Sequence, residues 1–216
     1  MTARFRLISA LALSAALVGC AGTGDIVVDE GVGITAVRGV CPGVGVPNNT
    51  GDITTFRVPG DTTAGNIDVV AALTNVRSTC NDSGEKVLTQ VTFDVLGRRT
   101  DVRGARTVTL PYYVVVVRGG TAVVTKRVGQ VTLTFADGQE RAQASGTGSA
   151  YIDKAEATLP KDIRDQLVRR RRAGAQDAAI DPMSQPEVKA AIARATFDVL
   201  VGFQMSQEQL VYNATR

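Results

Sequence analysis

The fold class of this 216-residue chain is decided by residues 107–135, TVTLPYYVVVVRGGTAVVTKRVGQVTLTF. Residues 112–117 form a β-branched and aromatic run that lacks helical periodicity, and in residues 131–135 apolar side chains alternate with threonines. Gly119 and Gly120 separate these two segments, and a glycine pair in this position is typical of a hairpin turn. The stretch therefore predicts two antiparallel strands. The valines at 114–117 are expected in a central strand buried on both faces, in preference to a partner-pairing or fibril-prone strand.

The same β pattern extends over residues 41–158. Residues 87–95 alternate strictly between apolar and polar, and residues 53–58 and 67–77 also have strand character. Turn signals separate the segments: Pro59 with Gly60, the cluster at 81–84, and Asp137 with Gly138. Seven or eight strands at this spacing predict a mainly β domain, an antiparallel immunoglobulin-like β-sandwich, and argue against βαβ units.

The composition changes after Thr158, and residues 159–216 are predicted to form a small C-terminal helical insertion or appendage. A helix is expected over 160–172, and Ser184 with Glu187 resembles a capping box at the start of a second helix. Residues 197–205 alternate with period two, which favours a final strand over a helix continuing through Leu200. Ser206 and Gln209 are expected to cap a last short helical turn. A helical hairpin inserted before the last strand is favoured, and a separate helical tail packed on one sheet is the alternative.

Residues 1–20, MTARFRLISALALSAALVGC, carry two arginines, then an apolar segment of twelve residues that is too short to span a bilayer, and then Leu17-Val18-Gly19-Cys20. This ending resembles the lipobox of bacterial lipoproteins. The resemblance covers only this segment. It implies that residues 1–19 are a signal peptide, that Cys20 is lipidated and that the new N-terminus is acylated. Ala21, where some family members have aspartate, implies delivery to the outer membrane.

This resemblance predicts a lipid anchor in the cell outer membrane, facing the periplasm, with exposure at the cell surface left open. The lipid on the Cys20 thiol and the acyl chain on the new N-terminus together suffice to hold the protein stably in a membrane. Residues 20–40 are rich in glycine and small side chains, and are expected to be a tether. Removing residues 1–19 leaves 216 − 19 = 197 residues and 24 − 2 = 22 basic against 21 acidic side chains, a formal charge of +1. Such a nearly neutral protein is not a general polyanion binder, so no nucleic-acid partner is expected.

Cysteine usage agrees with this compartment. Once Cys20 is lipidated, Cys41 and Cys80 remain, and in an oxidising periplasm an even remainder predicts one disulfide. Their spacing lacks the Cys-x-x-Cys pattern of redox and zinc sites. A reactive or metal-binding pair is therefore the weaker alternative.

The chain contains no histidine, which excludes Ser-His-Asp and Cys-His nucleophiles and histidine metal ligands. No Walker loop, EF-hand loop, GxSxG or SxxK motif occurs. Many of the aspartates stand beside glycine, threonine or asparagine, where turns are expected. We therefore predict no catalytic residues, no metal site and no cofactor.

The strongest local charge is the run Arg169, Arg170, Arg171 and Arg172. The functional interpretation is contact with an anionic surface such as lipid headgroups. The simpler interpretation, which we favour, is a solvated helix end whose positive charges complement the helix dipole.

These observations predict a non-enzymatic, lipid-anchored cell-envelope protein that acts as a structural or protein-interaction module with another envelope protein. The alternative is a periplasmic lipoprotein that binds a small ligand or lipid in an apolar cavity between the sandwich and the helices.

Overall fold

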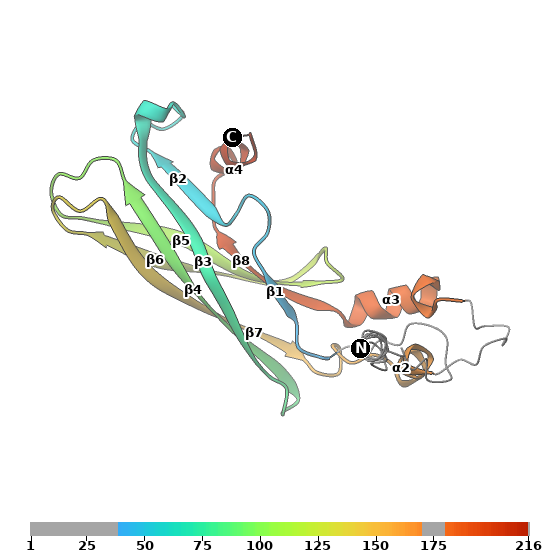
Figure 1. Ribbon diagram of the computed structural model, residues 1–216. Coiled ribbons are helices and arrows are strands. Elements are labelled where there is room, and N and C mark those ends of the chain that lie inside the picture. Colours follow the sequence, from blue (N-terminus) through green and yellow to red (C-terminus); the bar gives the residue numbers. More distant parts are fainter. Residues whose placement is uncertain (1–38, 170–179, 216) are drawn as a thin grey trace, which may run out of the picture. The chain divides into compact units, whose positions relative to one another are not determined.

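A computed structural model describes residues 39–169 and 180–215, which belong to one compact unit (Figure 1). The signal peptide, Cys20 and nearly all of the expected tether lie outside the described residues. Within the described part of the chain, eight strands form two four-stranded sheets with the orders β1-β8-β5-β6 and β2-β3-β4-β7. The strands are β1 (Gly43–Gly45), β2 (Asp52–Phe56), β3 (Ile67–Asn81), β4 (Lys86–Arg99), β5 (Arg106–Arg118), β6 (Ala122–Phe135), β7 (Arg141–Asp153) and β8 (Phe197–Phe203).

The strand pairs are antiparallel with one exception, and the mainly β prediction is confirmed. β1 pairs with β8 in parallel, so that Val44 lies opposite Val199. The expectation of a purely antiparallel sandwich is therefore wrong for this pair. The sequence Gly43-Val44-Gly45 is too short and too poor in side chains to carry a pairing pattern, so its direction is set by the chain around it.

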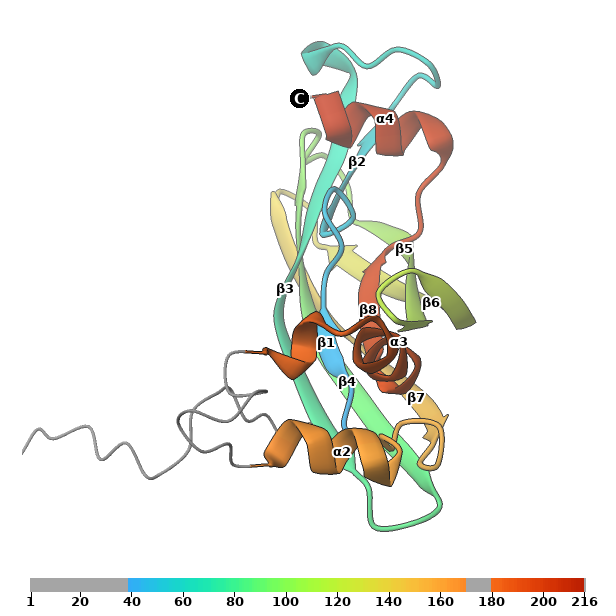
Figure 2. The ribbon, with the colours of Figure 1, turned by 90° about the vertical axis from the view of Figure 1, so that its right-hand side faces the viewer.

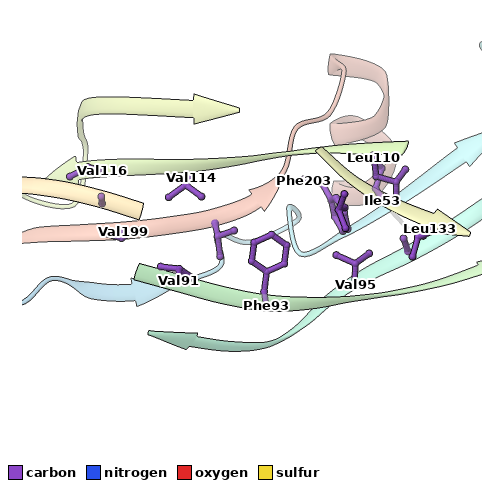
Figure 3. Packing of buried hydrophobic residues seen from close by; sticks show 14 of the residues in the cluster. Ile53, Val91, Phe93, Val95, Leu110, Val114, Val116, Leu133, Val199 and Phe203 are labelled. Carbon is purple, nitrogen blue, oxygen red and sulfur yellow. The ribbon is translucent and has the colours of Figure 1, made fainter. Parts of the chain in front are cut away.

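Apolar side chains of both sheets meet in one core, as Figure 3 shows for Phe93 of β4 and Val114 of β5. The alternation expected at 87–95 is confirmed, because the odd-numbered side chains from Val87 to Val95 are buried, while the even-numbered ones between them are exposed or half-buried. The period of two gives β4 one buried face. Members of the core from the remaining strands include Ile53, Val69, Leu110, Leu133, Ile152, Val199 and Phe203.

The four valines at 114–117 lie in β5 between β8 and β6, and all four are buried. The prediction of a central strand covered on both faces is confirmed. The hairpin that joins β5 to β6 is also confirmed, because Gly119 and Gly120 have φ of 60° and 79°. Non-glycine residues rarely adopt this left-handed backbone, which explains the glycine pair.

The C-terminal region holds α2 (Lys161–Val168), α3 (Pro186–Ala195), β8 and α4 (Gln207–Thr215). The expected final strand is confirmed, and α2 and α3 precede it as an insertion. Ile163 and Leu167 of α2 pack with Val188 and Ile192 of α3 in a small apolar cluster separate from the main core. α4 follows β8 and lies beside β2, where the ring centroids of Tyr212 and Phe56 are 5.1 Å apart (Figure 1, Figure 2).

Of the two expected helix caps, one is confirmed and one is wrong. At α4 the Ser206 hydroxyl accepts from the Gln209 backbone N–H, and the Gln209 side chain accepts from the Ser206 N–H. At α3 the N-cap is Gln185 and its side chain makes no capping bond. Ser184 instead ends a 3₁₀ turn, η3 (Pro182–Ser184), which Asp181 caps by accepting from the Met183 N–H.

Candidate functional site

The predicted disulfide is present. Cys41 precedes β1 and Cys80 lies near the end of β3, with 6.1 Å between their Cα atoms. These strands belong to different sheets, so the bond joins the two layers of the fold. Neither cysteine is a free thiol, and the disulfide therefore has a structural role here.

The expected arginine helix is shorter than predicted. α2 ends at Val168, and Arg169 is its C-cap residue with an extended backbone. The prediction that the arginines continue this helix is wrong for Arg169, because α2 already ends where its apolar face, Ile163 and Leu167, ends. Arg170, Arg171 and Arg172 lie outside the described residues. Contact of this run with an anionic surface stays a prediction.

The space between the sheet and the helices was the expected place for a ligand. There, Cys41, Leu159, Ile192 and Asp198 line a cavity of about 120 Å³. Small-molecule sites commonly measure roughly 300–1,000 Å³. The cavity is therefore too small for a ligand of ordinary size.

A second buried feature escaped the sequence analysis. The side chain of Arg99, at the end of β4, is 1% exposed and donates to four backbone carbonyls. Its Nε donates to Gln139 at 2.8 Å, Nη1 to Gly104 at 2.8 Å, and Nη2 to Val102 and Ala136 at 2.7 Å. Among the described residues no carboxylate pairs with it. The guanidinium thus ties the 100–105 loop to the 136–140 turn, and its chemistry is structural.

The most exposed apolar segment of the fold is the first half of β6. We call residues 122–128 the β6 arm; every one of them is exposed, although they pair with the buried part of β5 (Figure 2). Val123 is 65% exposed and Val128 is 60% exposed. β6 is the last strand of its sheet in the described structure, so the other edge of the arm has no strand beside it. Such an edge presents N–H and C=O groups to solvent.

The β6 arm also carries positive charge. Lys126 and Arg127 are exposed, and the Lys126 ammonium lies 5.0 Å from the ring centroid of Tyr113 on β5. Lysines and bulges are common on strand edges because they discourage pairing with identical chains. The β5–β6 ladder has a register shift between Val116 and Val117, opposite Val123 and Thr125 of the arm. The positive charge and the register shift are therefore features that discourage pairing of the arm with a second copy of itself.

The sequence analysis missed the β6 arm. The signal was present, because residues 122–128, AVVTKRV, lack the inside–outside alternation of residues 129–135. The sequence also contained a signal for the burial of Arg99, because this residue continues the odd-numbered, inward-facing positions of β4.

In the described part of the chain, no three histidine, cysteine, aspartate or glutamate side chains gather to hold a metal ion. Within the same residues no helix is long and apolar enough to cross a membrane. No family model matches the chain, and neither does any curated protein or solved structure.

Proposed function

We propose that this chain is a non-enzymatic lipoprotein of the bacterial outer membrane that binds an envelope protein through the β6 arm. Cys20 holds the lipid anchor, residues 1–19 are removed as a signal peptide, and the sandwich faces the periplasm. The partner supplies an extended segment with acidic side chains, which pairs with the free edge of β6.

A single observation carries the interaction part of this proposal: β6 has an open edge whose exposed side chains combine valines with two cations. Backbone hydrogen bonds along a strand edge supply affinity, and the side chains beside it supply specificity. Lys126 and Arg127 would oppose a second copy of the same arm and favour carboxylates. The absence of histidine from the sequence supports a binding role over nucleophilic catalysis.

We further propose that the sandwich is immunoglobulin-like in general outline only. Two packed sheets and a disulfide between the layers support this description. The order β2-β3-β4-β7 places three consecutive strands side by side, whereas immunoglobulin domains interleave theirs.

The interaction is tested by photo-crosslinking in the native envelope. Benzoylphenylalanine replaces Val123 or Val128 in the full chain, and replaces the similarly exposed Val58 or Val211 as matched controls. We expect one adduct of discrete mass from the β6 positions alone, and its loss when Lys126→Glu and Arg127→Glu are added. Equal labelling at all four valines, insensitivity to the charge reversal, or an adduct of twice the chain mass would contradict the proposal.

The anchor is tested separately with Cys20→Ala. Membrane attachment should be lost, because a single apolar segment of twelve residues does not span the bilayer. Fractionation into soluble and membrane extracts measures this directly. Retention of the variant in the membrane fraction would refute the lipid anchor.

A further inference from the structure

We propose that the outward face of the β2-β3-β4-β7 sheet holds a binding site for a fatty acid, a single acyl chain with a carboxylate head. The site is a groove of about 720 Å³, within the usual size range of small-molecule sites. We call it the Leu96 groove; its defining residues are Val70, Ala72, Leu96, Arg98, Arg141 and Gln143. The inference is independent of the protein partner proposed for the β6 arm, which lies on the other sheet.

Strand register explains how these side chains come together. On β4, odd-numbered side chains fill the core, so the even-numbered Leu96 and Arg98 face outward. Leu96 lies opposite Ala72 of β3 and Gln143 of β7. Arg98 lies opposite Val70 and Arg141 in the next row. The groove therefore has one row with an apolar floor and one row that ends in two cations.

The floor of the groove is apolar in a position where solvent-facing sheets are normally polar. Leu96 is 48% exposed, and Val70 and Ala72 line the surface beside it. Burying exposed apolar area favours binding of an apolar ligand. No aromatic side chain lines this groove among the described residues, so it offers no platform for stacking a sugar or a base. A flexible aliphatic chain is the ligand that such a floor fits.

The charged row indicates the head group. Arg98 and Arg141 are direct cross-strand partners, and like charges in this position destabilise a sheet. Glu140 offsets the charge of Arg98 from 3.6 Å, between Nη1 and Oε1, whereas the Arg141 side chain makes no ion pair or hydrogen bond within the described residues. A carboxylate above this pair would relieve the repulsion and accept charge-assisted hydrogen bonds from guanidinium groups.

One further acidic side chain faces outward near the groove. Asp94 lies one row beyond Leu96 and does not line the groove. Its oxygens accept hydrogen bonds of 2.8 Å from Asn75 and Ser145, which lower the pKa of Asp94 below its usual range. This carboxylate stays charged at neutral pH, so the anionic head belongs at the arginine end and the chain extends from it over Leu96.

The test uses the full chain in a non-ionic detergent with a photoreactive dodecanoate that carries a diazirine on its chain. Labelled peptides are mapped by mass spectrometry, so that binding in the groove is distinguished from partition into micelles. Unlabelled dodecanoate, dodecanol and dodecyl phosphate then compete at equal concentrations. Arg98→Gln with Arg141→Gln removes the charges, and Leu96→Glu places a negative charge on the floor. Arg194→Gln and Val58→Glu are matched exposed controls elsewhere in the fold.

We expect labelling of the segments that contain Leu96 and Arg141, and competition by dodecanoate at least tenfold better than by dodecanol. Labelling should fall about tenfold in the double arginine variant and in Leu96→Glu, with wild-type thermal unfolding, and should be unchanged in both controls. Labelling outside the groove, equal competition by dodecanol, or insensitivity to both variants would overturn the proposal. Better competition by dodecyl phosphate would overturn the carboxylate head.

Discussion

β4 and β6 are strands of the same length, 14 residues each, yet they have opposite surroundings. β4 lies between β3 and β7 and buries every second side chain from Val87 to Arg99. β6 lies at a sheet edge and buries side chains only in its second half, at Val131, Leu133 and Phe135. Valines occur in both strands, so composition alone does not separate them. The comparison indicates that the position of a strand in its sheet determines whether its β-branched side chains pack in the core or stay exposed on the surface.

The largest expected effect concerns Arg99 at the end of β4. Arg99→Met should lower the free energy of unfolding by roughly 5 kcal/mol, because four buried carbonyls lose charge-assisted hydrogen bonds. Chemical denaturation measures the loss. The adjacent Arg98→Met is the control and should change stability by less than about 0.5 kcal/mol, since Arg98 faces solvent. Equal effects of the two substitutions would show that the hydrogen bonds of the buried Arg99 side chain do not stabilise the fold.

The second effect concerns the disulfide, which holds β1 to the sheet that contains β4. Cys41→Ser with Cys80→Ser should lower the free energy of unfolding by about 4 kcal/mol, because the bond closes a separation of 39 residues. Denaturation of the oxidised protein and the double variant gives the difference. In the native protein, Cys41 and Cys80 should resist alkylation until the disulfide is reduced. Two reactive thiols before reduction would contradict the bond.

The third effect compares the two strands directly. Phe93→Ala in β4 should lower the free energy of unfolding by about 3 kcal/mol, because it empties space between the sheets beside Tyr112, whose ring centroid is 4.9 Å away. Val123→Ala in the β6 arm should cost less than about 0.5 kcal/mol, since this side chain is exposed. Urea denaturation of both variants tests the contrast. A loss above 2 kcal/mol for Val123→Ala would mean that the arm is covered in the free protein.

The smallest effect concerns the outward face of β4. Hydrogen bonds from Asn75 and Ser145 lower the pKa of Asp94 below its ordinary value of 3.8. A lowered pKa in the folded state stabilises the protein above pH 3.8, and this contribution is lost as pH falls through the folded pKa. The thermal midpoints of the wild type and Asp94→Asn should therefore differ most near neutral pH and converge as the pH falls below 3.8. A difference in thermal midpoint that grows as the pH falls would show that the hydrogen bonds of Asp94 do not stabilise its charged form.

Much of the fold could be predicted from the sequence because period-two patterns and glycine turns are local signals. The alternation at 87–95, the hairpin at Gly119 and Gly120 and the final strand near 197–203 are all present. The cap at Ser184 was wrong because the Ser184 hydroxyl donates to the Asp181 carbonyl within η3, and Gln185 takes the N-cap position of α3. The parallel pairing of β1 depends on distant strands, and three residues carry too little pattern to specify it.

The candidate surfaces were harder to predict because they depend on tertiary position. The missing alternation in residues 122–128 signals a change of surroundings, but the exposure of the β6 arm follows from the place of β6 at the end of its sheet. The pairing of Arg98 with Arg141 follows from the register between β4 and β7, which are separated by a whole hairpin in the sequence. Arg99 was also missed, although its odd-numbered place on β4 continues the inward-facing positions of that strand.

Amide hydrogen exchange of β4 and the β6 arm, compared between the purified protein and isolated outer membranes, tests the central claim most directly. Slow exchange marks hydrogen-bonded, buried backbone. We predict that residues 86–99 exchange slowly in both preparations, and that the amides of residues 122–128 that point away from β5 exchange quickly when purified and slowly in the membranes. Fast exchange of these amides in both preparations, or their slow exchange already in the purified protein, would contradict the proposed role of the β6 arm as a partner-binding edge.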